Sequence, residues 1–225
     1  LDRSSAASDV YKRQVLWIQM YRSPLTTDIE RSRLVGFVPM FVASVAFWSL
    51  FQQQFTVIAL YSDERLNRNL FGIEVPPGMV QSINPLFIIL FAAVFGALWT
   101  KLGDKQPSYA VKFSMALVVI GGALLLFLPF AGGGANSTPM WAMVLILFLF
   151  TMGELMLSPV GNSMATRLAP KAFPTRMFGL WLLSLSLGTA LSGSLAGFYN
   201  PDDASAERTY FLAMFAVMIA LGALI

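Results

Sequence analysis

The chain has 225 residues, of which 56% are hydrophobic and 12% are charged, and its mean hydropathy is +0.67. So few charged side chains cannot keep the surface of a water-soluble domain hydrated, and the composition therefore indicates a protein embedded in lipid. The sequence contains neither Cys nor His, which excludes disulfide scaffolds, Cys/His zinc sites and catalysis by either residue type. The net charge of +3 is compatible with nucleic-acid binding or with the basic rim of a membrane protein, so the positions of the charges must decide.

The first residues differ from the usual start of a membrane protein. Residues 1–14 begin without Met and lack the apolar core of a signal peptide, and we interpret them as a non-native read-through of adapter or library sequence. Residues 15–33 are expected to form a cytoplasmic lead-in, in which Thr27 and Glu30 fit a capping box and predict the start of a helix. At the other end Ile225 lies inside an apolar run, and we interpret the chain as a fragment cut at both ends.

Apolar stretches occupy most of residues 34–225, and each is long enough to cross a bilayer, which takes roughly 20 helical residues. They lie at about 34–61, 79–100, 110–130, 140–166, 177–199 and 209–225. These runs are too long for strands and lack polar alternation, whereas a helix satisfies all its backbone groups within one segment. The sequence therefore predicts an all-α membrane fold, a bundle of six helices.

The basic residues gather on one side of the predicted spans. Of the 15 Lys and Arg residues, 12 precede the first span or lie in the connections after the second and fourth spans, and only Arg65, Arg68 and Arg208 lie on the other side. The positive-inside rule then places both chain ends in the cytoplasm, in a multi-pass protein of the cell (plasma or inner) membrane. Because the basic residues form no stripe with aromatic partners, nucleic-acid binding is excluded.

Glu154, in the fourth span, is the one ionisable residue expected deep within a span. A carboxylate at the bilayer centre costs about 2.5 to 3.5 kcal/mol on insertion scales, so it should face a wet cavity, pair with a cation or take up a proton. The other spans offer no Lys or Arg as its partner, so the cation must come from a substrate or from protein outside this chain. A structural ion pair with that other protein is the alternative explanation.

The residues after Glu154 add a hydroxyl and a site where the helix can bend. Ser158 lies one helical turn later on the same face, so a carboxylate and a hydroxyl can address one ligand. Pro159 removes a backbone donor, and with Gly161 beside it the sequence predicts a kink suited to a gate. Proline kinks are common in membrane helices and more often only shape packing, so both explanations stay open.

Other polar and aromatic side chains in the spans have two explanations each. Gln52, one turn from Trp48 in the first span, and Asn84 in the second span are costly in hydrocarbon unless they meet polar partners or water. A ligand site and interhelical hydrogen bonding explain these amides equally well. Trp181 in the fifth span is either an anchor at the membrane interface or a pocket wall.

Glycines mark two further features of the sequence. Gly193 and Gly197 in the fifth span form a small-xxx-small pair, which predicts a close approach of helix backbones there. The run Gly132-Gly133-Gly134 lies in an uncharged loop with no helix start to hold a phosphate, so a nucleotide site is not expected.

Several motifs resemble those of the proton-dependent oligopeptide transporters, which belong to the major facilitator superfamily. The likeness covers about residues 24–225, in order and with the family's spacing. It rests on Phe47-Trp48, Gln81 to Phe87, Pro107-Ser108 to Lys112-Phe113, Gly153-Glu154-Leu155 to Ser158-Pro159-Val160-Gly161, and Leu168-Ala169-Pro170 to Met177-Phe178-Gly179-Leu180-Trp181.

The resemblance implies a twelve-helix transporter of two six-helix bundles, of which this chain is the C-terminal half and its partner is a missing N-terminal half. Such proteins import di- and tripeptides together with protons and use no metal or other cofactor. By similarity, Glu154 would hold the amino terminus of the peptide, while Ser158 and Asn84 add polar contacts. Trp48 and Trp181 would shape the pocket.

The sequence departs from the family at Gln52, where many members carry an acid implicated in proton coupling. Gln cannot titrate, so proton binding at this position is in doubt, although some members also carry Gln. Two other functions remain open: a transporter of another solute, such as nitrate or a peptide-like compound, and a membrane scaffold that moves nothing. An enzyme is not expected, because the spans offer no His, Cys or Asp beside the acid.

Overall fold

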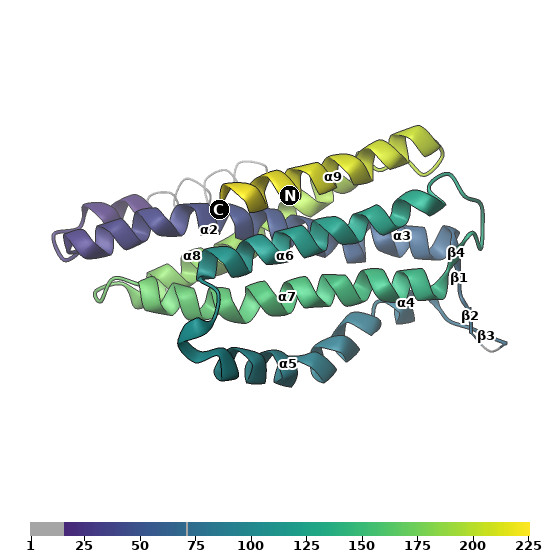
Figure 1. The fold of residues 1–225 in the computed structure, drawn as a ribbon. Helices are drawn as coiled ribbons and strands as arrows, with labels where there is room; N and C mark the ends of the chain where they lie inside the picture. The colour runs from purple at the N-terminus through teal and green to yellow at the C-terminus, as the bar shows by residue number, and fades with distance from the viewer. Residues whose placement is uncertain (1–15, 71) are drawn as a thin grey trace.

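The computed structural model describes residues 16–70 and 72–225 (Figure 1). The segment interpreted as read-through, residues 1–14, lies outside this description, and residues 16–22 are helical. Within the described chain, 6 helical segments are long and apolar enough to cross a membrane. The predicted all-α membrane bundle is therefore confirmed.

The segments have these bounds, given in chain order. The first consists of α2 (Asp28–Phe51), the 3-10 turn η1 (Gln52–Phe55) and α3 (Val57–Glu64), and the second of α4 (Pro77–Val80), α5 (Ile83–Leu102) and η2 (Gly103–Lys105). The others are α6 (Tyr109–Leu124) with η3 (Leu125–Phe130), α7 (Met140–Leu168), α8 (Pro174–Ala196) and α9 (Ala204–Leu224).

Four two-residue strands occur in the loops of the described chain, at the end shown on the right of Figure 1. The strand β1 (Leu66–Asn67) pairs in parallel with β4 (Thr138–Pro139). The strand β2 (Asn69–Leu70) pairs antiparallel with β3 (Ile73–Glu74). The first pairing ties the end of α3 to the start of α7.

The predicted capping box at the start of α2 is confirmed. Thr27 N donates to Glu30 Oε2 at 2.9 Å, and Glu30 N donates to Thr27 Oγ1 at 3.4 Å, so two amides left free by the first helical turn are satisfied. The other oxygen of Glu30 accepts a hydrogen bond from Lys171 N at 2.9 Å. The carboxylate of Glu30 therefore helps to cap the start of α2 and also joins this helix to the loop between α7 and α8.

The first spanning segment is interrupted where the sequence reads Gln52-Gln53-Gln54. The α-helix ends at Phe51, and a 3-10 turn carries the chain over four residues before α3 begins. Two of the amides bond the neighbouring helix, because Gln52 Nε2 donates to Thr189 Oγ1 and Gln53 Nε2 donates to Ser192 O, both at 3.2 Å. The run 34–61, expected as one continuous span, is therefore two helices with a joint.

The helices α2, α6, α7 and α8 enclose the core, and α9 packs on α6. The helices α2 and α8 approach closely at Gly188, where an added Cβ would lie 2.5 Å from Trp48 Cβ and 2.8 Å from Val45 O. Nothing lies within 4 Å of a Cβ added at Gly193, and at Gly197 the only neighbour is Ser194 O, one turn earlier. Within the described chain no other helix approaches this glycine pair, and the predicted close packing there stays a prediction.

The helix α5 stands at the edge of the bundle and packs chiefly on α7 (Figure 1). None of the residues in its most apolar window is buried inside the described chain. Its long apolar surface must therefore be covered by lipid or by other protein.

The two ends of the bundle differ in charge. We call the end that carries Arg31, Lys101, Lys105, Arg167 and Lys171 the basic end, shown toward the left of Figure 1. At the opposite end, Arg65 Nη1 lies 2.5 Å from Glu207 Oε2, with 7% and 0% of the two side chains exposed. This buried pair was not predicted from the sequence, in which Arg65 lies in a loop and Glu207 precedes the last expected span.

Candidate functional site around Glu154

Glu154 lies near the middle of α7, and its side chain is half-buried. Its Oε2 atom is buried and has no hydrogen-bond partner among the described residues. No Lys or Arg in the same part of the chain lies within ion-pair distance of it. A buried, ionised carboxylate without a cation is strongly destabilising, so the arrangement fits a proton or a positively charged ligand.

Asn84 and Thr151 flank the carboxylate between α5 and α7. Asn84 lies beside Glu154 and is 5% exposed. Its Nδ2 atom donates to Thr151 Oγ1 at 2.9 Å, and Thr151 Oγ1 in turn donates to Leu147 O at 2.8 Å. Thr151 was not predicted as a site residue, although its position three residues before Glu154 puts both side chains on one helical face.

Ser158 and Pro159 follow on the same helix. Ser158 is half-buried one turn after Glu154, and Pro159 is exposed. The helix α7 continues through Pro159 as far as Leu168, so the proline does not end it. Both Pro159 and Val160 line a cavity at the basic end of the bundle.

Gly161 makes room for the indole of Trp181. A Cβ added at Gly161 would lie 2.1 Å from the Trp181 ring. The ring is 4% exposed, and its Nε1 atom donates to Asn162 Oδ1 at 2.7 Å. Phe113 contacts the other ring atoms edge-on, with 6.0 Å between the ring centroids. Trp181 therefore lies inside the bundle, held between α6, α7 and α8.

Trp48 and Gln52 lie on the seam between the first segment and α8. Trp48 is 8% exposed, and its buried Nε1 atom has no partner in the described chain. Gln52 is half-buried and bonds Thr189, as described above. No hydrogen bond of the described residues joins Trp48, Trp181 or Gln52 to Glu154, so the geometry groups Asn84 and Thr151, rather than these side chains, with the acid.

Two buried glutamines add polar atoms that the sequence analysis did not assign to a site. Both side-chain polar atoms of Gln54 and of Gln81 are buried and lack partners in the described chain. Leaving such atoms unpaired costs about 1–3 kcal/mol each. Together with Glu154 Oε2 and Trp48 Nε1, they give the described chain buried polar atoms that require water, ligand or further protein. No group of three or more His, Cys, Asp or Glu residues in that part of the chain is placed to hold a metal ion.

Comparison with known proteins identifies close relatives. The profile of the POT family matches residues 4–212. An uncharacterised transporter of Bacillus subtilis (strain 168) is 38% identical over 213 residues, which are 94% of this chain and 42% of that protein. A di-/tripeptide transporter of Lactococcus lactis subsp. cremoris is 32% identical over 211 residues, 91% of this chain and 41% of that protein.

Solved structures give the same result for the fold. A mutant peptide transporter in complex with alafosfalin superposes with a TM-score of 0.86 at 39% identity, over 96% of this chain and 44% of that one. A POT family transporter in complex with 5-aminolevulinic acid superposes with a TM-score of 0.87 at 37% identity, over 96% and 45% of the two chains. The chain thus spans less than half the length of these relatives.

Proposed function

Because the chain belongs to the POT family, whose members are transporters of the major facilitator type, we propose that it is the C-terminal half of a peptide transporter. In this proposal it packs against an N-terminal six-helix half, and the whole protein imports di- and tripeptides together with protons. Support comes from the relatives named di-/tripeptide transporter and from the share of their length that the chain spans. The basic end would face the cytoplasm, with both ends of the chain on that side.

The observation that carries the substrate assignment is the unpaired oxygen of Glu154. The amino terminus of a peptide is an ammonium group, which offers the positive charge and donors that Glu154 Oε2 lacks in the described chain. Asn84, beside the acid, and Ser158, one turn away, would bond the backbone groups of the same peptide. Trp48 and Trp181 would shape the pocket from α2 and α8.

Coupling to protons follows from competition at one carboxylate. A proton and a peptide ammonium both neutralise Glu154, so each changes the occupancy of the other. Gln52 cannot bind a proton and instead bonds Thr189, so coupling would rest on Glu154 and on acids in the N-terminal half. Binding between two halves would favour their rocking about the site, with α7 near Pro159 and Gly161 as part of the gate.

Replacement of Glu154 in the complete transporter tests the proposal. We expect Glu154→Gln to abolish uptake of labelled dipeptide, because the amide keeps the shape of the side chain but cannot pair with an ammonium. Glu64→Gln is the matched control, since Glu64 is exposed at the end of α3 and should tolerate the same change. Membrane insertion should be equal for both variants.

The same assay separates peptides from other solutes. Unlabelled dipeptides should compete with the labelled dipeptide, whereas nitrate and free amino acids should not. Competition by nitrate alone would assign the transporter to another substrate. Full uptake by the Glu154→Gln variant would remove the assigned role of the acid, and a complete protein that moves none of these solutes would favour a scaffold.

A further inference from the structure

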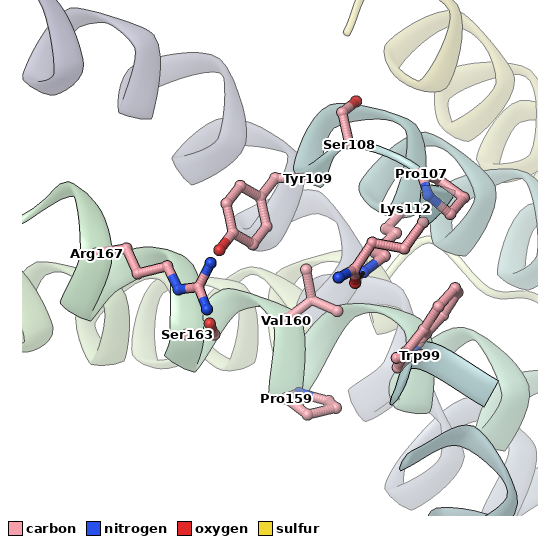
Figure 2. A pocket seen from close by; sticks show the side chains of 10 residues that line it. Trp99, Pro107, Ser108, Tyr109, Lys112, Pro159, Val160, Ser163 and Arg167 are labelled. Atoms are coloured by element: carbon pink, nitrogen blue, oxygen red, sulfur yellow. Dashed lines mark hydrogen bonds between the residues drawn. The ribbon is translucent and has the colours of Figure 1, made fainter. Parts of the chain in front are cut away.

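The cavity that Pro159 and Val160 line at the basic end is polar and lies away from Glu154 (Figure 2). It has a volume of about 420 Å³ and is bounded by the end of α5, the connection to α6, the start of α6 and the last turns of α7. The polar and charged side chains that matter here are Trp99, Ser108, Tyr109, Lys112, Ser163 and Arg167. No Asp or Glu lines it.

Lys112 is a buried cation without an anion. Its side chain comes from the first turn of α6, and the residue is 4% exposed. Nζ donates to Gln106 Oε1 at 2.6 Å and lies 4.1 Å from the centre of the Trp99 ring. No carboxylate in the described chain forms an ion pair with it. An amide and a ring face stabilise an ammonium only in part, so its charge remains uncompensated.

The other groups around the cavity are also donors. The side chain of Arg167, from the last turn of α7, forms no hydrogen bond or ion pair in the described chain, and Figure 2 shows it pointing toward Tyr109. The Nε1 atom of Trp99 is buried and has no partner there. Ser108 caps α6 by accepting a hydrogen bond from Val111 N at 3.3 Å, so the positive end of this helix also faces the cavity region.

This combination selects for an anion. Two cations, an unpaired indole N–H, hydroxyl groups and a helix start offer charge and hydrogen bonds to several oxygens at once, which is the requirement of a phosphate group. The neutral lining residues Trp99, Pro159 and Val160 give the cavity an apolar wall. Beyond it, α5 exposes Leu98, Val94 and Leu90, with 43%, 55% and 55% of each residue accessible.

We propose that this cavity binds a phosphate group, with Lys112 and Arg167 pairing with its oxygens. The phosphate can belong to an acidic phospholipid, whose acyl chain would follow the exposed face of α5, or to a soluble phosphate. The cavity borders α7 from Pro159 onward, so a bound phosphate group would stabilise the end of α7 that lies at the basic end. The same helix carries Glu154. The binding itself is independent of what the protein transports.

Thermal unfolding of the complete transporter in detergent tests this site. We expect added phosphatidylglycerol to raise the unfolding midpoint relative to phosphatidylcholine, and native mass spectrometry to show bound phosphatidylglycerol. Lys112→Gln should weaken this binding about tenfold or more, because a charge-assisted hydrogen bond is lost. Without phosphatidylglycerol or phosphate, the same variant should unfold at an equal or higher temperature, because it removes an uncompensated buried charge.

A double variant, Lys101→Gln with Lys105→Gln, is the matched control for general attraction to acidic lipid. Both residues are exposed at the basic end and line no part of the cavity, so the variant should bind like the wild type. Arg167→Gln provides a second test at an exposed residue, in case Lys112→Gln fails to fold. Inorganic phosphate at constant ionic strength identifies the source: protection by phosphate alone indicates a soluble ligand, and protection by phosphatidylglycerol alone indicates lipid.

Two outcomes would overturn the proposal. One is unchanged binding of both phosphatidylglycerol and phosphate in the Lys112 and Arg167 variants. The other is a loss of binding in the surface control as large as in the cavity variants, which would mean that only net charge matters.

Discussion

Glu207 organises the end of the bundle opposite the basic end. Its carboxylate pairs with Arg65, accepts a hydrogen bond from Tyr199 Oη at 2.8 Å and accepts another from Gly132 N at 2.8 Å. Burial raises the pKa of the Tyr199 hydroxyl, and its hydrogen bond to the carboxylate raises that pKa further. Burial alone would lower the pKa of Arg65, but the hydrogen bond and charge of Glu207 hold it above its usual value.

Glu207→Gln should therefore destabilise the protein strongly. The variant leaves the Arg65 guanidinium buried without a counter-charge, and breaking a buried pair in this way costs about 3–5 kcal/mol. Thermal unfolding in detergent should show a large drop in midpoint, while Asp202→Asn, an exposed change in the preceding loop, should show almost none. The double variant Arg65→Gln with Glu207→Gln should recover part of the loss, and additive losses would contradict this account.

Sequence alone located some of these residues and missed others for a physical reason. Glu154 stands out because apolar residues surround it on both sides, so its burial can be inferred from the chain itself. Glu207 and Lys112 lie near helix ends, where charged residues are usually solvated, and only tertiary packing buries them. The burial of Glu207 and Lys112 depends on segments far away in the sequence, so it cannot be predicted from the residues next to them.

The contact between α7 and α8 at Gly161 depends on the absence of a side chain. We expect Gly161→Ala to cost about 1–3 kcal/mol, because the new methyl group would displace the Trp181 ring from a packed position. Gly193→Ala in α8 is the matched control, since nothing lies within 4 Å of its added Cβ. That change should stabilise the helix by about 0.5–1 kcal/mol.

Unfolding midpoints of the two alanine variants measure this difference. A Trp181→Leu change combined with Gly161→Ala should restore stability relative to Gly161→Ala alone, because the smaller side chain leaves room for the methyl group. Equal midpoints for the Gly161 and Gly193 variants would show that α7 and α8 separate without cost at this point.

Element boundaries could be predicted where a local signal exists. The capping box of Thr27 and Glu30 fixed the start of α2, because both partners lie within one turn. The joint at Gln52–Phe55 could not be predicted from the three glutamines, because it also depends on acceptors offered by α8. The glycine spacing in α8 likewise did not indicate which face of that helix meets another.

The whole molecule leaves α5 largely uncovered, and the chain spans less than half the length of its relatives. If the proposed two-half architecture holds, this chain alone, reconstituted in liposomes, should show no dipeptide uptake, because the proposed N-terminal half would form the other wall of the peptide pocket. Co-reconstitution with the proposed N-terminal half should restore uptake. Uptake by the chain alone that disappears with Glu154→Gln would contradict the proposed two-half architecture.

Three polar contacts join the first spanning segment, α2 with η1, to α8. Ser44 Oγ in α2 and Ser184 Oγ in α8 lie 2.6 Å apart, and the bonds from Gln52 and Gln53 in η1 reach Thr189 and Ser192 farther along α8. Because hydrogen bonds in an apolar medium resist separation, these two helices should travel as a single body whenever the bundle rearranges. Motion relative to the core would then fall to α5, which in the described chain one such bond, from Asn84 Nδ2 to Thr151 Oγ1, joins to α7.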